Sequence, residues 1–276
     1  MIKACGTVLF RQHPLEKALD AIRQIGFDYV ETQSVGPWCP HVDVEKDDPI
    51  RYADLVKSYG FKGTTALWMR NGQLIGSHVV VEWAVRTLEW ASAAGIPVVN
   101  TGDGFKPEGM SDEDAFKLYE ERMAQILEAC ARNRTRIAIE PHGTFSLTGD
   151  GLARLMAYST SPWLGVNYDA CNIYRASYVE NKEGNAARNV QLEKTEDEVD
   201  VLRRVVDRVV HVHAKDVRDG HCVALGDGNV NVAGCIEVLK QAGYDGAISL
   251  ETEGDEPFEV SVEYAKKGFE FLNAHL

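Results

Sequence analysis

Four short hydrophobic runs in this sequence each end in a side chain that can bind a metal ion. The runs at 136–140, 164–169, 209–213 and 247–251 end in Glu140, Asp169, His213 and Glu251. Three carboxylates and one imidazole suit Mn²⁺, Mg²⁺, Co²⁺ or Zn²⁺. A single acid after a strand is commonly only a helix cap. Four such endings on four separate runs favour a metal site.

The elements that would position these side chains are strands alternating with helices. Short runs rich in β-branched residues predict strands at 2–9, 28–33, 61–67, 97–101, 136–140, 164–169, 209–214 and 247–252. Apolar spacing and end signals predict helices at 14–25, 49–59, 78–94, 112–132, 149–159, 196–208, 232–242 and 256–273. Several helices are followed by a glycine and an apolar residue, a pattern typical of helix ends, at Gly26, Gly60, Gly95 and Gly243.

This alternation predicts a single (β/α)₈ TIM barrel that spans residues 1–276. A length of 276 residues fits one domain, because such barrels take about 250 residues. The strands of a closed barrel end on one face, where the four candidate ligands would converge. An open doubly wound sheet is the alternative fold. No Gly-x-Gly-x-x-Gly follows a strand, so the sequence does not support a dinucleotide site.

Composition argues against several classes of partner. The chain carries 42 acidic residues against 29 lysines and arginines, and its formal charge of −13 disfavours nucleic acid. No run approaches the ~20 apolar residues of a membrane span. The six scattered cysteines form no Cys-x-x-Cys pair, and the N-terminus lacks a signal-peptide profile. We therefore expect a cytoplasmic protein with reduced thiols.

One polar segment interrupts the alternation. Residues 175–193 are rich in Asn, Glu and Lys, and they follow the run that carries Asp169. Long loops of this kind are usually functional or disordered. We interpret the segment as a lid over the site or as a contact with another subunit, in a homo-oligomer or with a heteromeric partner. A plain surface insertion is the alternative.

Several motifs resemble those of the xylose isomerase-like TIM barrel superfamily, often labelled sugar phosphate isomerase/epimerase. They are Ile-Glu140-Pro-His142-Gly, Asn-Tyr-Asp169-Ala-Cys-Asn172, His211-Val-His213-Ala-Lys215-Asp216 and the segment from Gly243 to Glu251. The resemblance covers nearly the whole chain. It implies that Glu140, Asp169, His213 and Glu251 bind one divalent ion, for which Mn²⁺ is our first choice. His211 would lie one layer deeper on the same face of its strand.

The resemblance implies proton removal from a carbon next to a carbonyl group. A metal ion would stabilise the enediolate that forms. The candidate catalytic bases are Glu140, Glu251 and His142, although His142 could instead bond a loop carbonyl. The first interpretation is an isomerase or epimerase of a sugar, keto-sugar or cyclitol.

Two departures from the ketohexose 3-epimerases keep other functions open. Those enzymes usually carry Glu six residues after the first ligand and His three after the second, where this chain has Ser146 and Asn172. Both departures weaken a ketohexose epimerase assignment, and Ser146 together with His142 favours a lyase or dehydratase that expels a β-substituent. A third hypothesis is a metal-binding subunit of a heteromeric enzyme that is inactive alone. The additional His ligands of the family's repair endonucleases are absent.

Further residues are candidate substrate contacts, and each has a structural alternative. The two cations could bind an anionic oxygen or pair with Asp216 and Asp219. The asparagine could bind hydroxyls or cap a helix, the tryptophans could face a sugar ring or pack in loops, and the acid could hold a hydroxyl or face solvent. These candidates are Asn172, Lys215, Arg218, Trp38, Trp68 and Glu31.

Overall fold

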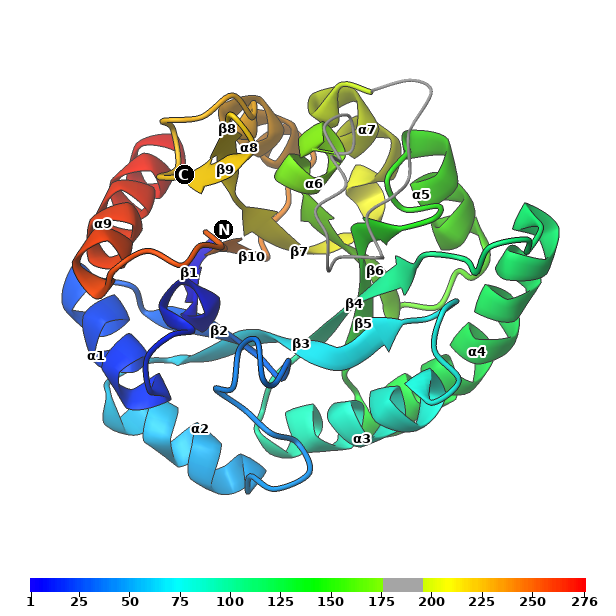
Figure 1. The fold of residues 1–276 in the computed structure, drawn as a ribbon, viewed down its shortest axis with the longest axis horizontal. Helices are drawn as coiled ribbons and strands as arrows, with labels where there is room; N and C mark the ends of the chain where they lie inside the picture. The colour runs from blue at the N-terminus through cyan, green and yellow to red at the C-terminus, as the bar shows by residue number, and fades with distance from the viewer. Residues whose placement is uncertain (176–195) are drawn as a thin grey trace.

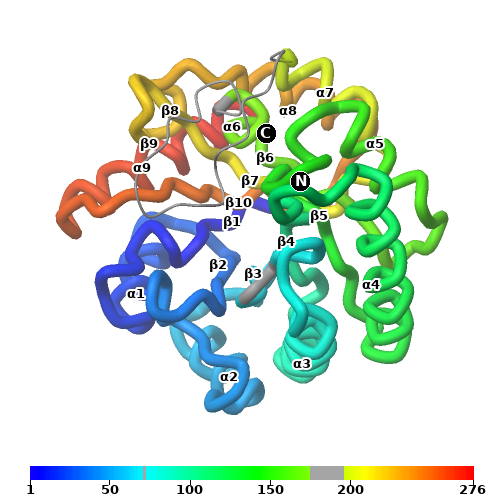
Figure 2. The backbone as a smooth tube through the Cα atoms, turned by 45° about the vertical axis from the view of Figure 1, so that its right-hand side comes forward, coloured from blue at the N-terminus to red at the C-terminus, as the bar shows by residue number. Residues whose placement is uncertain are grey.

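Eight parallel strands close into a barrel in the order β1-β10-β7-β6-β5-β4-β3-β2. The computed structural model describes residues 1–175 and 196–276, without the side chains of residues 71 and 72. The helices form a ring outside the strands (Figure 1), and α1 contacts α9 where the ring closes. In the view turned by 45°, α2, α3 and α4 again lie outside the strands (Figure 2). The predicted TIM barrel is confirmed, and the open sheet is wrong.

The barrel strands are β1 (Ile2–Gly6), β2 (Tyr29–Gln33), β3 (Gly63–Gln73), β4 (Val98–Gly104), β5 (Arg136–Gly143), β6 (Leu164–Asp169), β7 (Val209–Ala214) and β10 (Ala247–Leu250). The helices are α1 (Leu15–Ile25), α2 (Pro49–Ser58), α3 (Val80–Ala93), α4 (Asp112–Asn133), α5 (Gly149–Ala157), α6 (Ala170–Arg175), α7 (Glu198–Val205), α8 (Val232–Gln241) and α9 (Phe258–His275). Short 3₁₀ helices are η1 (Thr7–Phe10) and η4 (Val206–Arg208). A separate antiparallel hairpin consists of β8 (Asp216–Arg218) and β9 (His221–Val223).

The observed elements differ from the predicted ones mainly at their ends. Strand β1 stops at Gly6 because residues 7–10 form η1, whereas the prediction extended it to residue 9. Helix α6 and the β8–β9 hairpin were not predicted. Apart from Arg175, the segment 175–193 lies outside the described residues, so its role as a lid or subunit contact stays a prediction.

Local sequence signals account for several helix ends. The predicted glycines have positive φ angles of 118°, 85°, 75° and 73°, at Gly26, Gly60, Gly95 and Gly243. This left-handed backbone costs glycine little, because glycine has no Cβ. At the start of α4, the Ser111 hydroxyl accepts a hydrogen bond from the Asp114 N–H. Such caps satisfy amide groups that the helix itself leaves unpaired.

The interior of the barrel changes from apolar to polar towards the carboxyl ends of its strands. Ala66, Val98 and Ala138 form a small buried apolar cluster separate from the main core. Val98 and Ala138 stand two residues before Asn100 and Glu140, so they face inward one layer below these polar groups. The apolar layer thus supports a polar layer above it. Among the described residues, no helix is long and apolar enough to span a bilayer.

Candidate metal centre

The four predicted ligands meet at the carboxyl end of the barrel. Glu140 ends the hydrophobic part of β5, Asp169 and His213 lie on β6 and β7, and Glu251 follows β10 directly. One potential ligand atom from each residue lies within 4.8 Å of the others, and all four residues are buried. Strands far apart in sequence therefore bring together the group that the sequence singled out.

Amide side chains hold two of these carboxylates in place. Asn172 Nδ2 donates to Glu140 Oε1 at 2.7 Å, and Asn167 Nδ2 donates to Glu140 Oε2 at 2.9 Å. Gln33 Nε2 donates to Glu251 Oε1 at 2.9 Å. Asn172, predicted to contact substrate or to cap a helix, thus contacts a ligand. Asn167 and Gln33 were not predicted, although each stands two residues from a predicted site residue on the same strand face.

Lys215 lies within the carboxylate cluster. Its Nζ atom is 2.8 Å from Asp169 Oδ2, 2.9 Å from Glu251 Oε2 and 3.1 Å from Glu253 Oε2, and its side chain is 1% exposed. The predicted alternative, a pair with Asp216, is wrong. Asp216 instead accepts backbone N–H bonds from Val217 and from residues 226, 228 and 230. These bonds hold residues 226–230, which follow the β8–β9 hairpin, against Asp216.

Burial and mutual repulsion shift the proton affinities of the cluster. Burial raises the pKa of Glu140 to about 8; the nearby His213 opposes this shift, and the negative charge of Glu251 adds to it. Burial lowers the pKa of His213, but Glu251, Glu31 and Glu140 together raise it well above its ordinary value. Without another cation, the cluster therefore retains protons near neutral pH. A divalent ion would displace those protons, as metals do at acidic and imidazole ligands, so this buried donor set fits such an ion.

His142 lies near the end of β5, two residues after Glu140. Its ring centroid is 5.9 Å from that of Trp68, whose own ring lies 6.5 Å from that of His213. The His142 backbone N–H donates to Ser146 Oγ at 2.7 Å, and Ser146 Oγ donates to Asp103 Oδ1 at 2.5 Å. Ser146, which stands where ketohexose epimerases carry Glu, is therefore turned towards a buried aspartate.

Asp103 was not predicted from the sequence. It is buried at the end of β4, and it also accepts the backbone N–H of Phe145 at 2.7 Å. Burial raises the pKa of Asp103 to about 6, although the bonds from Ser146 and Phe145 oppose the shift. The carboxyl group fixes the segment that carries His142.

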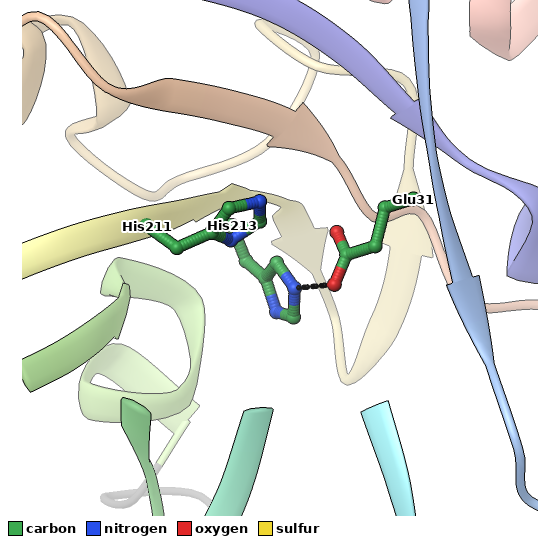
Figure 3. Close-up of side chains that lie close together, drawn as sticks. All are labelled: Glu31, His211 and His213. Atoms are coloured by element: carbon green, nitrogen blue, oxygen red, sulfur yellow. Dashed lines mark hydrogen bonds and ion pairs between the residues drawn. The ribbon is translucent and has the colours of Figure 1, made fainter. Parts of the chain in front are cut away.

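Glu31 and His211 belong to the layer beneath the ligands. Glu31 is buried and accepts a hydrogen bond from His213 Nε2 at 2.8 Å (Figure 3), so the predicted alternative of a solvent-facing acid is wrong. Burial opposes ionisation of Glu31, but His213 and His211 outweigh it and lower the pKa to about 2. His211 lies one layer deeper, as expected, with Nδ1 2.9 Å from Asn167 Oδ1.

The other candidate contacts lie at the periphery. Trp38 is 40% exposed, and the Arg11 guanidinium lies 4.7 Å from the centre of its ring. Arg218 is exposed at the end of β8, next to the hairpin turn. Cys171, two residues after Asp169, is fully buried in the core.

Family membership follows from a match to residues 19–275, described as the xylose isomerase-like TIM barrel. The chain belongs to this family. It is 26% identical over 203 residues to "Uncharacterized protein MJ1311" of Methanocaldococcus jannaschii, covering 71% of this chain and 64% of that protein. It is 24% identical over 188 residues to the inosose dehydratase of Histophilus somni, covering 61% and 58%. The matches thus span less than two thirds of either relative.

Solved structures agree with this fold. One of them, a D-tagatose 3-epimerase-like protein, has a TM-score of 0.78 and 19% identity, with 100% of this chain and 97% of that chain covered. At this identity the likeness concerns the fold. The proteins similar to this chain include inosose dehydratases in sequence and sugar 3-epimerases in fold.

Proposed function

We propose that this protein is a divalent-metal-dependent enzyme that moves a proton next to the carbonyl group of a sugar, keto-sugar or cyclitol. The observation that carries the proposal is the buried group of Glu140, Asp169, His213 and Glu251, whose ligand atoms lie within 4.8 Å of one another. When bound, a divalent ion supplies a Lewis acid that stabilises negative charge on the substrate oxygens. Mn²⁺ is our first candidate ion.

Isomerisation or epimerisation is the outcome that we propose first. Glu140 and Glu251 approach His213 Nδ1 from different strands, each with its Oε2 at 3.0 Å. One carboxylate can therefore take a proton from carbon while the other returns a proton to another carbon or face.

Other residues of the chain define the environment of this step. Lys215 supplies positive charge among the carboxylates, within 3.1 Å of three of them. Trp68 and His142 form one wall, and we propose that His142 exchanges protons with the substrate. We propose Arg218 and Trp38 as peripheral contacts that act only when substrate fills the mouth of the barrel.

A lyase or dehydratase is the second candidate, and the Ser146 position favours it. In this structure Ser146 binds Asp103, so the position offers the substrate no additional carboxylate. Elimination needs one base and one group that protonates the leaving oxygen, roles that Glu251 and His142 would fill. The similarity to an inosose dehydratase supports this candidate.

Elemental analysis of the purified protein and of His213→Ala tests the proposal first. We expect about one Mn, Co, Mg or Zn per chain, lost in the variant. Metal-loaded protein is then incubated with keto-sugars and inososes in deuterium oxide and followed by mass spectrometry. Deuterium uptake without loss of water marks an isomerase or epimerase, and loss of water marks a dehydratase. A protein that binds no ion even after reconstitution would refute the proposed site.

A further inference from the structure

His213 is held at both edges of its ring. Its Nδ1 atom lies 3.0 Å from Glu140 Oε2 and 3.0 Å from Glu251 Oε2. Its Nε2 atom lies 2.8 Å from Oε1 of Glu31, which belongs to β2 on the other side of the barrel interior (Figure 3). The side chains of His213 and Glu31 are 0% and 1% exposed, so water does not compete for this contact. The ring therefore cannot turn without breaking contacts on both sides.

Glu31 is itself fixed by the neighbouring strand. Asn100 on β4 donates from Nδ2 to the same Glu31 Oε1 at 2.9 Å, and Asn100 is fully buried. The oxygen that faces His213 therefore accepts two hydrogen bonds from two directions. Because an ionised carboxylate can only accept hydrogen bonds, His213 must carry a proton on Nε2 to bond Glu31.

The alternative is a second metal site, because Glu31, His211 and His213 each offer a ligand atom within 4.8 Å of the others. The contacts of His211 argue against it. Its Nδ1 lies 2.9 Å from Asn167 Oδ1 and its Nε2 lies 3.2 Å from Thr65 Oγ1, so both ring nitrogens already have hydrogen-bond partners. The direct bond between His213 and Glu31 also joins the two atoms that would have to separate around an ion.

We infer that Glu31 is a positioning residue that prepares His213 to be a metal ligand. By accepting the Nε2–H bond, its carboxylate keeps that proton on Nε2, so the proton that an incoming ion displaces is the one on Nδ1, the nitrogen that faces Glu140 and Glu251. A carboxylate behind a ligating imidazole fixes the ring and raises its basicity. The inference rests on the proposed metal centre. It replaces our expectation that Glu31 holds a substrate hydroxyl.

The variant Glu31→Gln keeps the shape and an oxygen acceptor but removes the charge. We expect its dissociation constant for Mn²⁺, measured by calorimetry with the ion alone, to rise by about 10–100-fold. The matched control is Glu45→Gln, which removes one acidic charge from a surface ion pair with Arg86. We expect this control to bind Mn²⁺ like the wild type. Glu31→Asp retains the charge and should recover part of the affinity.

A tautomer measurement on the wild type does not depend on how the variant folds. In the Zn²⁺-loaded protein, ¹⁵N chemical shifts of His213 should show Nε2 protonated and Nδ1 unprotonated. The reverse assignment would overturn the inference.

Three results of the binding experiment would also overturn it. Unchanged Mn²⁺ affinity in folded Glu31→Gln would mean that Glu31 does not position the ligand, especially if only the KM for substrate rose. Two ions per wild-type chain and one in the variant would identify a second metal site. In both cases the proposed function survives. If the wild type binds no divalent ion, the proposed function and the inference fall together.

Discussion

The variant Lys215→Met tests whether the lysine ammonium and a metal ion neutralise the same carboxylates. The Lys215 side chain is 1% exposed, and its Nζ lies 2.8 Å from Asp169 Oδ2 and 2.9 Å from Glu251 Oε2. Methionine has a similar length and no charge. Removing one partner of a buried ion pair costs about 3–5 kcal/mol, because the remaining charge has no compensation.

The expected effect is a less stable metal-free protein that gains more from metal. Unfolding entropy scales with chain length, and 276 residues correspond to roughly 0.6 kcal/mol per kelvin. The loss of about 3–5 kcal/mol therefore lowers Tm by about 5–8 K in protein treated with chelator. A divalent ion that binds the folded state restores the missing positive charge. The rise in Tm on adding Mn²⁺ should then be larger in the variant than in the wild type.

Differential scanning calorimetry with and without saturating Mn²⁺ measures both quantities. The control is Lys62→Met, because Lys62 pairs with Asp28 on the surface and is 62% exposed. This control should change Tm little, and its metal-induced rise should equal that of the wild type. An equal or smaller rise in Lys215→Met would refute the reasoning, because the ammonium and the ion would then occupy different places.

Three further predictions concern turnover, the metal site and pH. We expect His142→Ala to lower kcat by about 10²–10⁴-fold with metal content unchanged, because His142 is outside the four-ligand group; equal loss of metal and kcat would contradict this. We expect Glu251→Gln to abolish activity and to weaken metal binding, as judged by turnover and elemental analysis, and retained activity would contradict the proposed site. The pKa of Asp103 is raised from 3.8 to about 6, so folding favours the protonated form of this carboxyl group. The contribution of Asp103 to the free energy of unfolding is therefore largest below pH 4 and is lost as pH rises through 6. Relative to Asp103→Asn, the wild type should therefore lose about 2 kcal/mol of unfolding free energy between pH 4 and pH 6, which urea titrations at each pH would measure; a pH-independent difference would contradict the raised pKa.

The sequence was sufficient to predict the barrel because its signals are local and repeated. Alternating strand and helix patterns, with glycines such as Gly26 and Gly243 at helix ends, fix the order of the elements. Eight βα units in that order close most simply into a barrel. Two elements were missed. Helix α6 has only 6 residues, and strands β8 and β9 of the hairpin have 3 residues each. Patterns this short carry too few residues to show a period.

Contacts between strands could not be predicted in the same way. Lys215 was paired with the adjacent Asp216 in one interpretation, whereas the barrel places it against Asp169 and Glu251. Glu31 was read as a substrate contact, whereas it lies 182 positions from His213 in sequence and accepts its hydrogen bond. The spacing of residues within a strand says which face they share, but the closure and register of the barrel decide which strand lies opposite.

The sequence by itself determined the order of the elements and the strand-end positions of Glu140, Asp169, His213 and Glu251, because both depend on periodicity along one chain. Only the tertiary structure decided how those side chains are supported. It placed a lysine among the carboxylates, turned Ser146 towards Asp103, and set Glu31 behind the His213 ring. Hydrogen bonds and ion pairs depend on distances of about 3 Å, and such distances between separate strands exist only after the barrel has closed.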